Sequence, residues 1–158
     1  NRSLHFMKDL KKGKKLRKKH IGILRTEKIL TPLDPADAKT LAEAIADVLD
    51  SKKGRDIKVL RVEDQTVITD YFVICTGNSS TQVKSLGGEL EYKLGLRGVD
   101  PVHFEGRDSD GWIVLDYSSV IVHIFSRELR DFYQLEKLYG DAEEIHFVGI
   151  DEAEEEEK

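Results

Sequence analysis

The stretch that decides the fold is a pair of apolar runs beyond the middle of the chain. Residues 110–125 read Asp-Gly-Trp-Ile-Val-Leu-Asp-Tyr-Ser-Ser-Val-Ile-Val-His-Ile-Phe. Two β-rich runs flank a short polar turn at Ser118 and Ser119, and the only tryptophan of the chain, Trp112, opens the first run. This pattern predicts a β-hairpin.

The segments before the hairpin alternate between helical and extended patterns. Asp34 followed by Pro35 predicts the start of a helix, and apolar residues at helical spacing carry that helix to about residue 53. Residues 57–62 and 67–75 predict two strands that pair with each other. The second is apolar enough on both faces to be a central strand.

The remaining elements follow the same alternation. Ser79 and Gln82 form a capping-box pattern at the start of a second helix. A strand over 102–104, a helix over 129–138 and an edge strand over 145–148 complete the set. The sequence therefore predicts an α/β (α+β) domain with a mixed sheet flanked by helices, in the order α-β-β-α-β-β-β-α.

Composition divides the chain into three parts. Residues 1–31 form a basic extension that we expect to be flexible, residues 32–149 a single folded domain, and residues 150–158 an acidic tail that we expect to be disordered. No apolar stretch is long enough to span a membrane and no apolar run near residue 1 supports a secretory signal, so we expect a cytoplasmic protein. Cys75 is the only cysteine, so internal disulfides and zinc sites built on several thiolates are excluded.

The basic extension has three open interpretations. Residues 1–30 hold eleven Lys and Arg against two acidic residues. Such a segment suits an arm that contacts RNA, because clustered cations release counterions from a phosphate backbone. It also has the charge of a transit peptide, although transit peptides are rich in Ser and Arg and this segment is rich in Lys. The third interpretation is a solvated extension.

The strongest enzymatic signal is the Gly77-Asn-Ser-Ser80 turn between a predicted strand and helix. A helix start presents free N–H groups that can bind a phosphate, and nucleotidyltransferases use a Gly-Ser turn in this way. They also need paired acidic residues for magnesium. The only D-x-D pattern is Asp108-Ser-Asp110, about thirty residues downstream in a polar turn, so the turn more simply predicts a helix cap.

Two other candidates favour structural roles. His123 lies within an apolar strand run, where a hydrogen-bonded core histidine is more frequent than a metal ligand. Cys75 lies in an apolar run with no base beside it, which suits a small core residue. We therefore predict no catalytic residues, no metal site and no cofactor.

The hairpin is the better candidate for function. Alternation places Trp112, Val114 and Asp116 on one face and Ile113, Leu115 and Tyr117 on the other. Periodicity alone does not say which face is exposed. Either face carries Trp or Tyr, which are enriched at binding hot spots, whereas the alternative is that these aromatic residues simply fill the core.

Five motifs, in order along the chain, carry a resemblance to a known family. They are Thr69-Asp-Tyr-Phe-Val-Ile-Cys-Thr-Gly-Asn-Ser-Ser-Thr-Gln-Val83, Glu105-Gly106, Asp110-Gly-Trp-Ile-Val-Leu-Asp-Tyr117, Val120-Ile-Val-His-Ile-Phe125 and Tyr133-Gln-Leu-Glu-Lys-Leu-Tyr-Gly-Asp-Ala142. Over roughly residues 36–142 the chain resembles the ribosomal silencing factor family, also called Iojap-like. The basic extension and the sequence after Ala142 depart from it.

The resemblance implies a nucleotidyltransferase-like fold without the catalytic acidic pair. Such proteins bind the large ribosomal subunit through ribosomal protein L-fourteen, block joining of the small subunit and lower translation when nutrients are short. They tend to form homodimers, and organelle relatives act in assembly of the large subunit. Two alternatives to silencing therefore stay open: a nucleotidyltransferase-like enzyme and an organelle assembly factor. By position, the resemblance implies that the contact with L-fourteen uses Trp112, Ile113, Leu115, Asp116, Tyr117, Val120 and Lys137.

Overall fold

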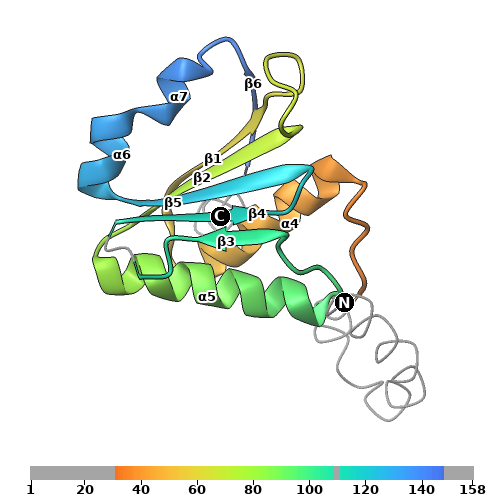
Figure 1. Cartoon of the computed structure of the whole chain (residues 1–158), viewed down its shortest axis with the longest axis horizontal. Coiled ribbons are helices and arrows are strands. Elements are labelled where there is room, and N and C mark those ends of the chain that lie inside the picture. Colours follow the sequence, from red (N-terminus) through yellow and green to blue (C-terminus); the bar gives the residue numbers. More distant parts are fainter. Residues whose placement is uncertain (1–30, 109–110, 148–158) are drawn as a thin grey trace, which may run out of the picture.

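The computed structural model describes residues 31–108 and 111–147 of the chain. Their centre is a six-stranded mixed sheet with the strand order β3-β4-β5-β2-β1-β6 (Figure 1). β4 (Trp112–Asp116) and β5 (Val120–Ser126) are antiparallel neighbours, so the predicted hairpin is confirmed. The structure also confirms the predicted α/β class with a mixed sheet between helices.

The middle of the sheet is β2 (Tyr71–Gly77), in which every residue is buried. It pairs parallel with β5 and antiparallel with β1 (Arg55–Arg61), as expected for a central strand. The prediction that this strand begins at residue 67 was wrong. Val67 and Ile68 are exposed loop residues, because the backbone leaves the sheet at Val62 and the Ile68 amide bonds to the Thr66 hydroxyl instead of a neighbouring strand.

Two long helices cover one face of the sheet. They are α4 (Ala38–Ser51) and α5 (Ser80–Leu96), coloured orange and green in Figure 1. α4 begins later than predicted, because Asp37 rather than Asp34 caps it by accepting from the Thr40 amide. The Asp34 carboxylate accepts from the Ala36 amide and forms the preceding turn instead.

The start of α5 uses the predicted cap with one change of partner. The Ser79 hydroxyl accepts from the Gln82 amide at 3.1 Å, which is half of a capping box. The Gln82 side chain accepts from the amide of Asn78, not of Ser79, and donates to the Lys53 carbonyl at 3.1 Å. The turn is therefore held to the end of α4 as well as to its own helix.

The opposite face of the sheet is covered at one end by two short helices, α6 (Arg127–Tyr133) and α7 (Leu135–Leu138), drawn in blue in Figure 1. The prediction of one continuous last helix was wrong at Gln134. This residue has a left-handed backbone (φ 47°), which breaks the helix after two turns. The break turns α7 relative to α6.

The two edge strands are short. β3 (His103–Glu105) pairs with β4, one residue later than predicted, and β6 (Glu143–Ile145) pairs with β1. The predicted edge strand over 145–148 is thus displaced towards the N-terminus, and its last residue lies outside the described part. The predicted basic extension up to residue 30 and the acidic tail also lie outside the described residues. Within the described residues, no helix combines the length and the apolar character that a bilayer crossing requires.

The sheet separates two apolar cores. The larger lies under α4 and α5 and includes Leu41, Ile45 and Leu90. The smaller lies on the other face around Phe72, Ile74 and Phe125, and Trp112 packs against its margin. Because α6 and α7 are short, they leave part of this second face of the sheet uncovered.

Candidate protein-binding surface

The two faces of the hairpin differ in burial. Ile113, Leu115 and Tyr117 are 1%, 0% and 3% exposed and belong to the core beneath α4 and α5. Trp112 and Asp116 point to the opposite face and are half-buried. The alternation of the strand therefore holds, and the face that carries Trp112 is the accessible one.

Trp112 lies in a cluster of aromatic rings. Its indole stacks on Phe125 with ring centroids 5.0 Å apart and an interplanar angle of 27°. The Tyr133 ring lies 4.8 Å from the indole, and Phe132 meets Tyr133 edge-on at 5.0 Å. Contact geometries of this kind hold aromatic rings in defined orientations.

The outer part of this cluster is exposed. Phe132 and Tyr133 are 75% and 47% exposed, and Leu138 on α7 is 75% exposed. We call the connected rings of Trp112, Tyr133 and Phe132 the aromatic patch. Exposed aromatic side chains in contact with one another are typical of protein-binding surfaces.

His123 lies beside the inner edge of the aromatic patch. Its Nδ1 accepts a hydrogen bond from Trp112 Nε1 at 3.2 Å, which confirms the prediction of a hydrogen-bonded structural histidine. Burial lowers the pKa of His123 to about 4, so the ring is neutral at physiological pH. Its Nε2 is buried and has no hydrogen-bond partner among the described residues.

The predicted contact residues separate into two groups. Ile113, Leu115, Tyr117 and Val120 are buried in the larger core, so in this conformation they cannot touch a partner directly. The remaining members, Trp112, Asp116 and Lys137, reach the surface. Asp116 lies near the far end of β4, where its carboxylate accepts from the Ser118 amide at 2.8 Å.

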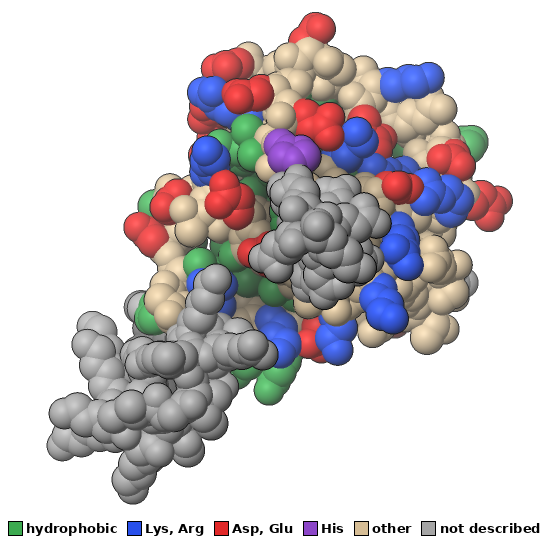
Figure 2. Space-filling view, turned by 180° about the vertical axis from the view of Figure 1, so that it is seen from behind, with side chains coloured by type: hydrophobic (Ala, Val, Ile, Leu, Met, Phe, Trp, Pro, Cys, Tyr) green, Lys and Arg blue, Asp and Glu red, His purple; other side chains and the backbone are tan. Residues whose placement is uncertain are grey.

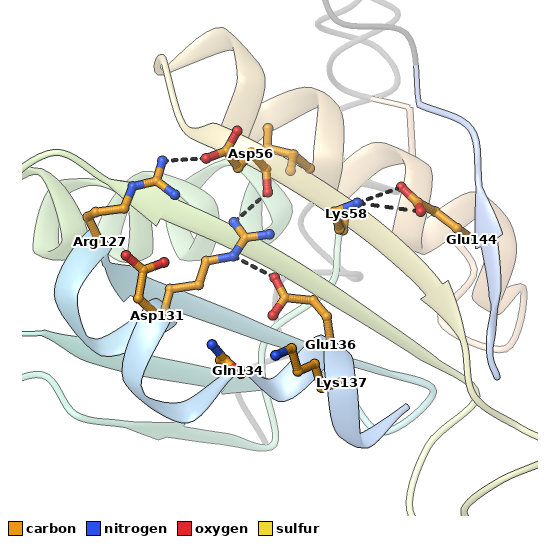
Figure 3. A pocket seen from close by; sticks show the side chains of 10 residues that line it. Asp56, Lys58, Arg127, Asp131, Gln134, Glu136, Lys137 and Glu144 are labelled. Atoms are coloured by element: carbon orange, nitrogen blue, oxygen red, sulfur yellow. Dashed lines mark hydrogen bonds and ion pairs between the residues drawn. The ribbon is translucent and has the colours of Figure 1, made fainter. Parts of the chain in front are cut away.

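Lys137 belongs to a charged pocket next to α6 and α7 (Figure 3). The pocket has a volume of about 530 Å³. Its lining contains four cationic side chains (Lys58, Arg127, Arg130, Lys137) and four acidic ones (Asp56, Asp131, Glu136, Glu144). Because the positive and negative side chains of the lining are equal in number, the pocket does not favour a highly charged anion such as a nucleoside triphosphate.

The centre of this pocket is the buried Arg130. Its guanidinium is bonded to the Asp56 carbonyl, to the Thr76 hydroxyl at 2.8 Å and to the Glu136 carboxylate at 2.6 Å. At the rim, the hydrogen bond from Arg127 lowers the pKa of Asp56. The pocket is therefore an ion-pair network that ties α6 and α7 to the sheet.

The residues considered for enzymatic chemistry occupy structural positions. The Asn78 and Gln82 amides at the Gly77–Ser80 turn already bond to side chains of the same segment, as in a helix cap. Cys75 is fully buried, and burial raises the pKa of its thiol to about 12. In the described part of the chain, no group of three or more His, Cys, Asp and Glu is arranged to hold a metal ion. Asp108 is exposed, and Asp110 lies outside the described residues.

The face seen from behind in Figure 2 carries mixed charges. Figure 2 shows acidic and basic side chains intermixed over the described part of the rear face, with hydrophobic side chains in small areas between them. We take the aromatic patch as the candidate binding surface, because its rings contact one another and its outer part is exposed.

The sequence interpretation missed Phe132 and Tyr133 as surface residues. Both lie within the helix predicted over 129–138, and that prediction did not separate an exposed face from a buried one. No local signal marked their exposure, because consecutive helical residues can both be buried, as Leu41 and Ala42 are in α4.

These observations define the class of protein: an α/β domain whose most distinctive accessible feature is an aromatic surface on a sheet. Residues 35–158 match the family described as "Ribosomal silencing factor during starvation". The chain is 36% identical over 104 residues to the ribosomal silencing factor of Bacillus subtilis, covering 66% of this chain and 88% of that protein. The chain therefore belongs to the ribosomal silencing factor family.

Two further comparisons extend this result. The chain is 35% identical over 111 residues to the mouse protein named "Mitochondrial assembly of ribosomal large subunit protein 1", covering 68% of this chain and 49% of the mouse protein. A crystal structure of a protein from Chromobacterium violaceum superposes with a TM-score of 0.61 at 32% identity, covering 73% of this chain and 93% of that one. The fold is thus similar to that of a solved protein at appreciable sequence identity.

Proposed function

We propose that this chain is a ribosomal silencing factor that binds the large ribosomal subunit through ribosomal protein L-fourteen. Bound there, it blocks association with the small subunit by occupying the joining surface, and so represses translation when nutrients are short. The observation that carries the proposal is the aromatic patch around Trp112, found on a member of this family. The mechanism is steric, and no catalytic step is required.

The proposed contact combines the exposed members of the predicted set with the aromatic patch. Trp112, Tyr133 and Phe132 are its proposed apolar centre, and the exposed Lys137 on α7 is part of its proposed polar rim. Asp116, at the opposite end of β4 from Trp112, is its proposed outermost member. An interface with a desolvated aromatic centre and a polar rim is the usual arrangement of protein complexes. The buried residues Ile113, Leu115, Tyr117 and Val120 contribute indirectly, by fixing the hairpin on the helical layer.

A subunit-joining assay tests this function. Purified large and small subunits are mixed with the chain, and the fraction of joined ribosomes is measured by sucrose-gradient sedimentation. We expect joining to fall as the chain is added, and cross-linking with mass spectrometry to connect the α6–α7 region to L-fourteen. Unchanged joining at saturating chain concentration would contradict the proposal.

The second candidate function is assembly of the large subunit in an organelle. The observation that favours it is the similarity to the mouse mitochondrial assembly protein. A reporter fused to residues 1–30 tests the two locations: we propose a cytoplasmic protein, so the reporter should stay outside isolated mitochondria, whereas import and cleavage would favour the organelle role.

Two further proposals concern partners. We propose that the basic segment 1–30 contacts RNA, so its deletion should reduce the salt dependence of ribosome binding. We also propose that the free chain is a homodimer, which light scattering coupled to size-exclusion chromatography tests directly. A monomeric mass, or a salt slope that deletion leaves unchanged, would contradict the respective proposal.

A further inference from the structure

The hydrogen bond between Trp112 and His123 joins the binding surface to the core. The two residues lie on neighbouring strands and on the same face of the sheet, with Trp112 opposite Phe125 and His123 opposite Val114. The Trp112 indole thus reaches diagonally across the strand pair, and its Nε1 lies 3.2 Å from His123 Nδ1. A diagonal contact of this kind is within reach of long aromatic side chains.

The direction of this bond specifies the state of the imidazole. The indole N–H is a donor only, so His123 Nδ1 must be the acceptor and carry no proton. In the neutral ring the proton then lies on Nε2. Since Nε2 is buried without a partner among the described residues, the imidazole includes a donor whose burial is unfavourable.

We propose that His123 is a positioning residue that sets the orientation of the Trp112 indole through this bond. Stacking on Phe125 supports one face of the indole. The hydrogen bond to His123 Nδ1 fixes the direction in which the indole N–H points, and so fixes how the indole is turned on the Phe125 ring. The ring that faces the partner is therefore held before binding, and less side-chain entropy is lost on association. The effect on binding rests on the proposed function, whereas the effect on orientation does not.

A purely space-filling role is the competing explanation. His123 is 8% exposed and also contacts the rings of Phe72 and Phe125 at centroid distances of 5.1 and 6.0 Å. An apolar residue of similar size would satisfy those contacts without burying a polar atom. What an apolar residue cannot supply is the acceptor for the indole N–H.

Two nearly isosteric variants separate these explanations. In His123→Asn the side-chain oxygen occupies the δ position and keeps an acceptor, whereas His123→Leu has a similar shape and no acceptor. The chain has one tryptophan, so the indole N–H gives one resonance in a ¹H–¹⁵N spectrum. The same proteins are then assayed for large-subunit affinity and for thermal unfolding.

We expect the indole resonance of the wild type and of His123→Asn to show slow hydrogen exchange, and that of His123→Leu to shift and exchange faster. Loss of one such bond should weaken large-subunit binding about tenfold in His123→Leu and much less in His123→Asn. Nitrogen shifts of the wild-type imidazole should show the proton on Nε2.

Three results would overturn the proposal. They are an unchanged indole resonance in folded His123→Leu, equal loss of binding in both variants, and an imidazole proton on Nδ1. If the wild-type chain does not bind large subunits at all, the proposed function fails, and the indole and imidazole spectra alone then decide the positioning role.

Discussion

The buried Arg130 network provides the sharpest test of how the proposed binding surface is held together. In Arg130→Met the side chain keeps its length and loses its charge and all three hydrogen bonds. The Asp56 carbonyl, the Thr76 hydroxyl and the Glu136 carboxylate then lose the donor that satisfies them. The Arg130 side chain is only 6% exposed, so the loss is not replaced by water at the guanidinium position.

The loss in the free energy of unfolding of Arg130→Met can be estimated from the burial of Arg130 and Glu136. Breaking a fully buried ion pair by removing one member costs roughly 3–5 kcal/mol. The Glu136 side chain is 27% exposed and is partly hydrated once Arg130 is gone, which places the expected cost near the lower limit, about 3 kcal/mol. For a domain of this size the midpoint of thermal unfolding should fall by about 10 °C.

A matched control lies one turn earlier on the same helix. Arg127 also bonds to Asp56, but both side chains of that ion pair are 54% exposed. We therefore expect Arg127→Met to unfold like the wild type, because exposed ion pairs contribute little. Urea unfolding followed by Trp112 fluorescence measures both variants, and equal stability of Arg130→Met and Arg127→Met would refute the reasoning.

Three further predictions concern titration, reactivity and backbone. The pKa of His123 is about 4 in the folded chain and 6.5 in the unfolded chain. The free energy of unfolding should therefore be highest above pH 6.5 and fall by up to roughly 3 kcal/mol as the pH drops towards and below 4, because the unfolded chain then binds the extra proton. Urea unfolding of the wild type and of His123→Asn across this pH range checks this difference. The Cys75 thiol is buried and its pKa is raised to about 12, so it should resist iodoacetamide at pH 8 in the native chain and react in urea. Mass spectrometry measures the labelling, and rapid labelling of the native chain would contradict the burial of the thiol. Gly88→Ala should raise the free energy of unfolding by about 0.5–1 kcal/mol, because a Cβ at this helical position meets open space. Gly106→Ala should lower it by roughly 1–3 kcal/mol, because φ is +86° and the Cβ would lie 2.3 Å from the Trp112 carbonyl oxygen. Equal melting temperatures of the two variants would contradict this difference.

Local patterns were sufficient to predict much of the sheet. The hairpin of β4 and β5 and the buried strand β2 were predicted because uninterrupted β-rich runs leave few alternatives to a buried strand. Element ends were less predictable. Asp34 and Asp37 are equally good caps by sequence, and only the backbone turn shows that Asp37 is the one used.

The proposed binding surface was only partly predictable for a different reason. Trp112 was singled out from composition and alternation, but the exposure of Tyr133 and Phe132 depends on how α6 packs on the sheet. That packing is set by Arg130, whose partners lie far away in sequence, and by the left-handed residue Gln134, which no turn signal marks. Long-range contacts of this kind leave no local pattern.

The central claim is that the aromatic patch binds the large ribosomal subunit, and the affinity of Trp112→Ala for purified large subunits tests it most directly. The matched control is Tyr92→Ala, which removes an aromatic side chain that is 60% exposed on α5. If Trp112 is a hot spot worth about 2 kcal/mol, its truncation should weaken binding about thirtyfold, and the control should bind like the wild type. A folded Trp112→Ala chain that binds as tightly as Tyr92→Ala would contradict the account.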